Sequence, residues 1–219
     1  MRTILIVNPV SKSLLSPLAA LGALGLAAAL LLAGLNSVTE ERIAAERRDH
    51  ALRGILSMLE GVDHDNDLLE TGRRIDIGGL EAVRVYTARR QGRPEAYVTD
   101  LTTPDGYSGD IRLLVAIDSG GSVLGVRVLE HRETPGLGDR IERSKSDWLK
   151  QFEGKSLASP PADAWAPDRR GGEFDTVTSA TITSTAVINA LKIVLQAFEA
   201  NRDTPFAGME DTDSRGQDD

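Results

Sequence analysis

The feature that most constrains this chain is an uncharged apolar run at residues 14–35, LLSPLAALGALGLAAALLLAGL. Its 22 residues match the roughly 20 that a helix needs to cross the hydrocarbon core of a membrane. A cleaved signal peptide is the competing interpretation, but its apolar region is usually only about 7–15 residues long and no clean cleavage site follows here. We therefore predict a transmembrane helix at 14–35, after a short N-terminal segment at 1–13.

Flanking charge is weak evidence for the orientation of this span. Arg2 and Lys12 precede the apolar run, and a group of arginines follows it: Arg42, Arg47, Arg48 and Arg53. A plain count would place the long C-terminal part in the cytoplasm. However, acidic residues are interleaved with these arginines, and long domains translocate largely regardless of flanking charge.

Composition narrows the possible functions. The chain has 25 basic and 33 acidic residues, a formal charge of −8, without the dense basic face of a nucleic-acid binder, so we expect no nucleic-acid partner. It has no cysteine, which excludes a lipoprotein anchor and any iron–sulfur cluster, disulfide or cysteine-ligated zinc held by its own residues. A redox group would have to be organic or held by other ligands.

The rest of the chain predicts one α+β domain with an antiparallel sheet and flanking helices. Residues 36–75 are interpreted as a stalk helix and linker, or alternatively as a helix that docks on a partner, since apolar residues recur at helical spacing between charged clusters. Strand-like residues 81–88 and 95–99 flank a Gln-Gly-Arg-Pro turn. A second hairpin, 111–117 with 123–129, is stronger in β-branched residues and is predicted to form the centre of the sheet.

Two helices and a tail complete the prediction. Residues 139–152 are expected to form a helix with Ile141, Trp148 and nearby apolar residues toward the core. Residues 185–200 form the clearer amphipathic pattern, with Ile188, Leu191, Leu195 and Phe198 on one face. The folded domain is expected at 76–204, and the acidic residues 205–219 are expected to be disordered.

The segment that carries chemistry is residues 175–185, DTVTSATITST, a run of hydroxyl side chains at the entrance to the last helix. A helix N-terminus presents unpaired N–H groups and the positive end of the helix dipole, which favour a bound phosphate. The alternative is that these hydroxyls only cap the helix. The residues alone leave both interpretations open.

Residues 175–181, DTVTSAT, resemble the flavinylation motif Asp-x-x-(Ser/Thr)-Gly-Ala-Thr of the FMN-binding domain family. That family includes the G subunit of the Rnf electron-transport complex and the C subunit of the sodium-translocating NADH:quinone reductase. The resemblance implies that a flavin transferase, using its own Mg²⁺, moves FMN from FAD onto Thr181 as a phosphoester. Ser179 stands where the family usually has glycine, at a place where unusual φ or close backbone approach is expected.

Further segments resemble the Rnf G subunit: 106–111 (GYSGDI), 125–139 (GVRVLEHRETPGLGD) and 145–148 (KSDW), so that the likeness spans most of residues 14–200. The loop 134–138, TPGLG, combines two glycines with an apolar Leu137 and is predicted to border the flavin ring, although a plain turn needs the same residues. His131 is interpreted as structural, and no metal site is predicted. The predicted cofactor-binding residues are Thr134, Gly136, Leu137, Gly138, Thr178, Ser179, Ala180 and Thr181.

The resemblance implies an electron-transfer subunit rather than an enzyme acting alone, and no catalytic acid, base or nucleophile is predicted. Its expected partners are the other subunits of a membrane complex, which passes electrons between ferredoxin or NAD and membrane subunits. The expected location is a bacterial inner membrane, with the FMN-binding domain on the periplasmic side. Two alternatives stand beside it: a non-catalytic tethered module with a reversible anion site, and the quinone-reductase C subunit, which is usually longer.

Overall fold

The computed structural model describes residues 21–22, 24–26, 52–200 and 206. The chain divides into two units, Met1–Ala51 and Leu52–Asp219, and the second holds the described fold. Within the predicted span, the five described residues are helical, and Leu21, Leu24 and Leu26 are 74%, 69% and 65% exposed. The rest of the predicted membrane helix, the first 13 residues, most of the stalk and nearly all of the tail lie outside the described residues.

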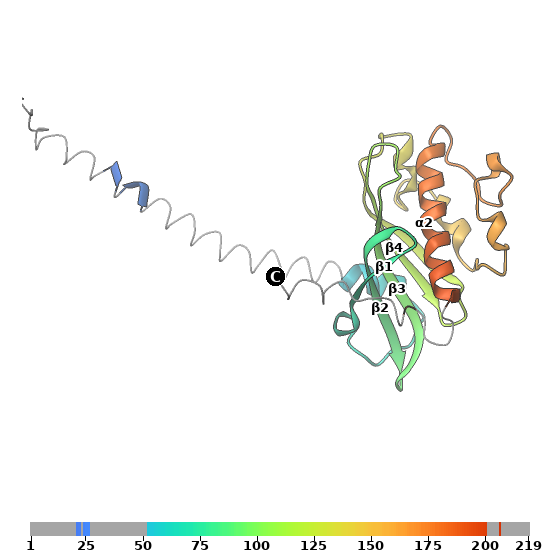
Figure 1. The fold of residues 1–219 in the computed structure, drawn as a ribbon, viewed down its shortest axis with the longest axis horizontal. Helices are drawn as coiled ribbons and strands as arrows, with labels where there is room; N and C mark the ends of the chain where they lie inside the picture. Colours follow the sequence, from blue (N-terminus) through green and yellow to red (C-terminus); the bar gives the residue numbers. More distant parts are fainter. Residues whose placement is uncertain (1–20, 23, 27–51, 201–205, 207–219) are drawn as a thin grey trace, which may run out of the picture. The chain divides into compact units, whose positions relative to one another are not determined.

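The domain is built on a five-stranded antiparallel sheet whose strands follow one another in sequence order (Figure 1). The strands are β1 Arg73–Ile77, β2 Leu80–Arg90, β3 Arg93–Thr103, β4 Ile111–Asp118 and β5 Val123–Glu130. Both predicted hairpins are confirmed, as β2–β3 and β4–β5. The predicted centre is wrong, because β1 adds a strand beyond β2, which leaves β3 in the middle and β5 at an edge.

Side chains alternate between the two faces of the sheet, and each face has its own core. On β4, Leu113 and Val115 belong to one apolar cluster, whereas Leu114 and Ala116 belong to the other, as the period of two in a strand requires. Helical residues 52–58 and the turn after them cover the second face, where Ile55 is 1% exposed. The compact unit that contains the sheet therefore also includes these helical residues, and it begins at Leu52.

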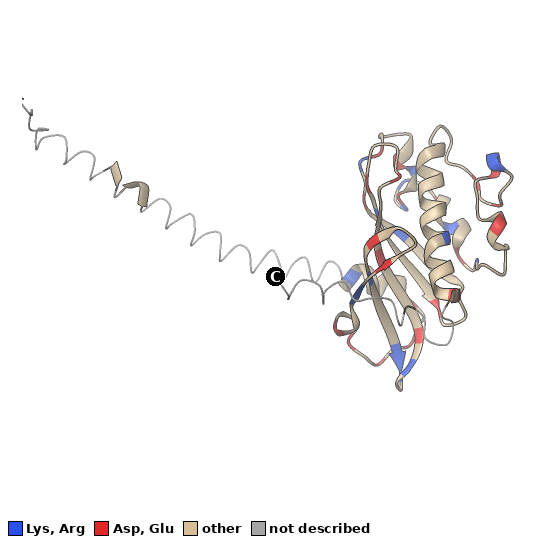
Figure 2. Ribbon diagram, viewed as in Figure 1, with Lys and Arg blue, Asp and Glu red and all other residues tan. Residues whose placement is uncertain are grey.

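The helix α2, Thr181–Ala200, covers the first face of the sheet (Figure 1). Its predicted apolar face is confirmed, and Ile188, Leu191 and Phe198 are fully buried. Among the described residues, α2 is long and apolar enough to span a membrane, but 61% of its apolar 18-residue stretch is buried inside the domain. It is the core helix of the domain, and Figure 2 shows hardly any charged residue along it.

The segment between β5 and α2 contains short 3-10 helices rather than the predicted helix at 139–152. They are η2 Gly138–Ile141, η3 Trp148–Phe152, η4 Ala162–Ala164 and η5 Asp168–Arg170, in addition to η1 Leu69–Thr71 ahead of the sheet. The Ser146 hydroxyl donates to the Arg140 carbonyl (2.6 Å) and accepts from the Trp148 N–H (3.2 Å). A serine side chain that binds the backbone in this way competes with a continuous helix.

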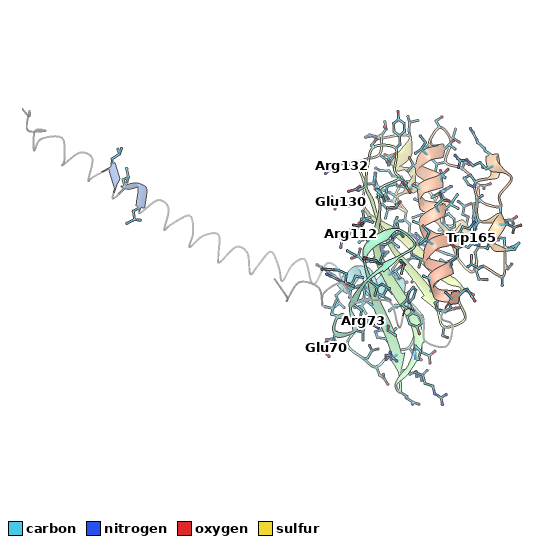
Figure 3. The ribbon with its side chains drawn as sticks, in the orientation of Figure 1. Glu70, Arg73, Arg112, Glu130, Arg132 and Trp165 are labelled. Carbon is cyan, nitrogen blue, oxygen red and sulfur yellow. The ribbon has the colours of Figure 1, made fainter. Side chains whose placement is uncertain are left out.

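Aromatic side chains anchor this irregular segment and the end of α2. Trp165 is 1% exposed, packs against Phe152 and Phe174, and lies across α2 from Arg112, Glu130 and Arg132 in Figure 3. Phe206 falls in the predicted disordered tail, yet it is 3% exposed and packs edge-on against Tyr97 and Phe198. The prediction of disorder does not hold at this residue.

Candidate functional site

The hydroxyl-rich segment folds back onto the start of α2. The helix begins at Thr181, four residues before the predicted start at Thr185. Ser184, fully buried, accepts a hydrogen bond from the Val177 N–H (3.0 Å) and donates one to the Ala180 carbonyl (2.9 Å). These two bonds hold residues 177–180 against the first turn, so that Thr181 opens the helix with a half-buried side chain.

Ser179 adopts a left-handed backbone conformation, with φ of 67°. This is the position at which the flavinylation motif usually has glycine, and glycine occupies that region without a steric penalty. An L-residue there is strained by about 1–2 kcal/mol. The departure from the motif therefore keeps the conformation that a glycine would take, at a cost in stability.

A pocket of about 400 Å³ opens at the N-terminus of α2. Three segments form its walls: the loop between β3 and β4, the TPGLG loop with the residue before it, and the first turn of α2 with the motif residues that precede it. The lining residues are Tyr107, Glu133, Thr134, Leu137, Gly138, Ser179, Ala180, Thr181, Ile182 and Thr183.

The structure brings together six of the eight predicted cofactor-binding residues around this pocket: Thr134, Leu137, Gly138, Ser179, Ala180 and Thr181. The other two lie elsewhere. Thr178 is exposed and lines a separate hollow of about 350 Å³ beside Arg140 and Trp148. Gly136 forms the exposed tip of its loop, at φ of 79°. These two predicted residues do not line the pocket, because a motif in the sequence does not reveal which side of the backbone each residue faces.

Sequence reasoning missed four lining residues, namely Tyr107, Glu133, Ile182 and Thr183. Three of the large apolar side chains at this site stay exposed in the folded domain: Tyr107 is 68%, Leu137 45% and Ile182 52% exposed. Large exposed apolar side chains gathered at one hollow mark a binding surface. Two of these residues could have been found from their neighbours in the sequence, since Tyr107 belongs to the GYSG segment and Ile182 follows the motif directly.

The TPGLG loop is tightened by one carbonyl. The Thr134 oxygen accepts hydrogen bonds from the N–H groups of Leu137 (3.1 Å), Gly138 (3.1 Å) and Asp139 (3.4 Å). Gly138 is buried where a Cβ would lie 2.8 Å from the Cβ of Glu133, so no larger residue fits without displacement. The loop thus brings its backbone close to the pocket, and Leu137 lines the pocket with a side chain that stays partly exposed.

An ionic network of Asp139, Glu142 and Lys145 directly follows the TPGLG loop and supports it. Lys145 Nζ lies 2.9 Å from Asp139 Oδ2 and 2.6 Å from Glu142 Oε1. The hydrogen bond from Lys145, together with the backbone N–H of Gly136, lowers the pKa of the Asp139 carboxyl. Hydrogen bonds from Lys145 and His131 lower the pKa of Glu142 as well.

His131 has a structural role in this network. Its Nδ1 accepts a hydrogen bond from the Glu133 N–H (3.0 Å), and its Nε2 lies 2.9 Å from Glu142 Oε1. Both ring nitrogens are therefore occupied by protein partners, and His131 is not among the lining residues. The interpretation of His131 as structural is confirmed.

The start of α2 can receive an anion. The first helical hydrogen bond of this segment runs from the Ser184 N–H to the Ala180 carbonyl (3.0 Å), so the N–H groups of residues 181–183 precede the helical ladder. All three residues line the pocket. Backbone donors at the positive end of a 20-residue helix favour a phosphate or carboxylate. Within residues 52–200, no group of three or more His, Asp or Glu side chains could hold a metal ion.

An anion site beside an apolar hollow suits a phosphorylated, flat cofactor, and comparison with known proteins gives the class. Residues 106–196 match the sequence profile of the FMN-binding domain. This range contains the Tyr107 loop, the TPGLG loop and most of α2, which are the three walls of the pocket.

The curated relatives extend the match over nearly the whole chain. It is 41% identical over 203 residues to the G subunit of the ion-translocating oxidoreductase complex of Pseudomonas aeruginosa, covering 91% of this chain and 95% of the relative. The G subunit from Shewanella loihica is 40% identical, with 88% and 93% covered, and that from Salmonella typhimurium is 43% identical, with 74% and 80% covered. The chain belongs to the family of G subunits of ion-translocating oxidoreductase complexes.

Among solved structures, the chain matches the C subunit of the Na⁺-translocating NADH-quinone reductase from Parabacteroides distasonis. It is 22% identical, covers 56% of this chain and 63% of that chain, and has a TM-score of 0.39.

Proposed function

We propose that this protein is the flavin-carrying electron-transfer subunit of an ion-translocating oxidoreductase complex, with FMN joined through its phosphate to Thr181. The observation that carries the proposal is the position of Thr181, which is half-buried, begins α2 and lines the pocket. Its hydroxyl lies at the same place as the free N–H groups of the helix, where a phosphate is stabilised.

The residues present fit FMN. A pocket of about 400 Å³ falls within the range of about 300–1,000 Å³ typical of small-molecule sites. The exposed apolar side chains of Tyr107, Leu137 and Ile182 offer contact to a flat ring. When bound, FMN supplies the electron-transfer chemistry, while the protein positions it and tunes its potential.

Attachment uses one hydroxyl once. A bond forms between Thr181 Oγ1 and the flavin-side phosphorus of FAD as the bond between the two phosphates breaks. AMP leaves with the electron pair, and the hydroxyl proton passes to the flavin transferase. Thr181 then serves as the anchor and takes no further part in electron transfer.

Mass spectrometry of the full chain, produced together with a flavin transferase, tests this assignment. We expect an FMN-sized mass addition on the peptide that contains Thr181, and covalent flavin fluorescence in a denaturing gel. Thr181→Val should abolish both. Thr185→Val is the matched control, because Thr185 lies one turn further along α2 and donates its hydroxyl to the Thr181 carbonyl (2.7 Å).

A colourless wild-type protein would instead favour a tethered module with a reversible anion site. Covalent flavin that survives in Thr181→Val would show that another hydroxyl is the acceptor. Loss of flavin in both variants would point to a general requirement for helix hydroxyls rather than to one acceptor.

We further propose that residues 14–35 anchor the protein as a single-pass inner-membrane subunit with the domain in the periplasm. The uncharged apolar run and the exposure of Leu21, Leu24 and Leu26 support the anchor. A periplasmic domain has a reason to hold FMN covalently, since a dissociated flavin would be lost from that compartment. Reporter fusions at the C-terminus test the orientation, and a cytoplasmic result would contradict it.

The partners proposed here are the other subunits of the complex, which deliver electrons to the flavin and accept them from it, and the flavin transferase during maturation. The family membership supports this assignment, since the relatives are named as subunits of a complex. Co-purification of the membrane-extracted protein with further subunits is the expected result.

A further inference from the structure

Glu133 is a buried carboxylate against the pocket, and the proposed function does not use it. It is 4% exposed and lines the pocket directly before the TPGLG loop. Glu133 and Asp139 are the two buried carboxylates in the described part of the domain, and they differ in their partners. Asp139 pairs with Lys145 at 2.9 Å, whereas Glu133 forms no ion pair with any described residue.

The partners of Glu133 are hydrogen-bond donors on two other walls of the pocket. Its Oε1 accepts from the Ser108 N–H (3.0 Å), in the loop between β3 and β4. Its Oε2 accepts a short hydrogen bond from the Thr183 hydroxyl in the first turn of α2. Both oxygens act as acceptors, which suits a carboxylate. One side chain therefore joins the three segments that enclose the pocket.

The backbone around Glu133 leaves room for this side chain and little else. A Cβ on Gly138 would lie 2.9 Å from Oε2, and a Cβ on Gly106 would lie 2.9 Å from Oε1. The two glycines therefore let the backbone approach the carboxylate from both sides. This close packing holds the carboxylate in one place.

We propose that Glu133 is a positioning residue for the flavin, which holds the three walls of the pocket together and lowers the midpoint potential of the bound FMN through its negative charge. This inference rests on the proposed function, because it requires FMN in the pocket. A buried charge without a cationic partner acts strongly on its surroundings, since the interior screens it less than water does. Reduction adds electron density to the flavin, so a nearby negative charge makes reduction less favourable.

The experiment uses the full chain carrying covalent FMN, in detergent, and measures the midpoint potential by spectroelectrochemical titration. Glu133→Gln keeps the shape and removes the charge, and we expect a positive shift of the potential. Glu153→Gln is the matched control: it makes the same chemical change outside the network of the TPGLG loop, and Glu153 pairs with Arg143 and does not line the pocket. We expect its potential to equal that of the wild type.

Thr183→Val separates charge from positioning, because it removes one hydrogen bond and leaves the carboxylate. We expect no positive shift of the potential, but faster amide hydrogen exchange at residues 104–110. An equal potential in Glu133→Gln and the wild type would overturn the charge effect. A positive shift in Thr183→Val as large as in Glu133→Gln would do the same, since loosening alone would then explain it.

Hydrogen exchange also tests the positioning role of Glu133 in protein that carries no flavin. In the flavin-free Thr181→Val protein, adding Glu133→Gln should speed exchange of the Ser108 amide, and unchanged exchange would overturn the positioning role. If Glu133→Gln does not fold, Thr183→Val alone tests that role by the same measurement. A wild type that carries no flavin would defeat the proposed function but leave this exchange result standing, so the two failures are distinguishable.

Discussion

The two ends of α2 differ in what they bury. At its C-terminal end, Phe198 is fully buried and packs edge-on against Tyr97, with ring centroids 5.7 Å apart, and against Phe206 at 6.2 Å. At its N-terminal end, Ile182 is 52% exposed and Thr181 faces a pocket. One helix thus contributes stability at one end and a binding surface at the other, and the contrast can be tested by changing each end separately.

The largest expected effect on stability lies at the packed end. Phe198→Ala should destabilise the domain by about 3–5 kcal/mol, because it empties a buried aromatic site. FMN attachment per folded molecule should stay at the wild-type level, since Thr181 is untouched. Urea denaturation gives the free energy of unfolding, and in-gel flavin fluorescence gives the attachment. A loss of stability below about 1 kcal/mol would contradict the assignment of this end to the core.

Ser184→Ala at the open end should have a smaller effect on stability and a direct one on function. It leaves the buried N–H of Val177 without its acceptor, at a cost of about 1–3 kcal/mol. Because residues 177–180 lose their tie to the helix, the yield of attached flavin should fall as well. The comparison variant is Thr185→Val, which removes a hydroxyl from the same helix and should retain attachment. Full attachment in Ser184→Ala would show that the fold of the motif does not depend on this tie.

Ser179→Gly should stabilise the protein slightly. The left-handed φ of 67° strains serine and suits glycine, so the gain should be about 1 kcal/mol after the larger entropy of an unfolded glycine is subtracted. Thermal denaturation measures the change, and Ser179→Ala, which keeps the strain, should show no gain. Stabilisation of both variants would mean that the serine side chain, and not the backbone conformation, is the cause.

The smallest expected effect is a dependence of stability on pH through the network behind the TPGLG loop. Asp139 and Glu142 have pKa values held below their ordinary 3.8 and 4.5, chiefly by hydrogen bonds from Lys145. Their contribution is complete above those ordinary values and is lost as pH falls through the lowered ones. The pKa of Lys145 is raised above its ordinary 10.5 for the same reason, so its contribution is lost only as pH rises beyond that value.

Lys145→Met should therefore flatten the acid side of the stability profile below about pH 4.5. Lys145 is 44% exposed, so solvent screening keeps the effect small. Denaturation midpoints between pH 3 and pH 7, compared with those of Lys150→Met on the exposed Lys150–Asp147 pair, measure it. Equal slopes for the wild type and Lys145→Met would contradict the role of this network.

Local patterns in the sequence predicted much of this fold. The strand-like, β-branched residues and the turns in 81–99 and 111–129 predicted both hairpins, because strand propensity and turn residues are properties of short segments. The apolar stripe of Ile188, Leu191 and Phe198 predicted the core helix for a similar reason. The predicted helix at 139–152 was wrong, since the bonds of Ser146 to the Arg140 carbonyl and the Trp148 N–H are not visible in a helical apolar pattern.

The sequence by itself determined the family, the acceptor candidate Thr181 and most of the residues around the pocket, because the motif and the TPGLG loop are each contiguous. Only the tertiary structure decided that Glu133 joins three walls of the pocket and that Thr178 lines a separate hollow. The physical reason is that the burial of a side chain and its contacts depend on which distant segments of the chain meet. Ser108, Glu133 and Thr183 come together through the order of the strands and the placement of α2, which no local pattern of side chains encodes.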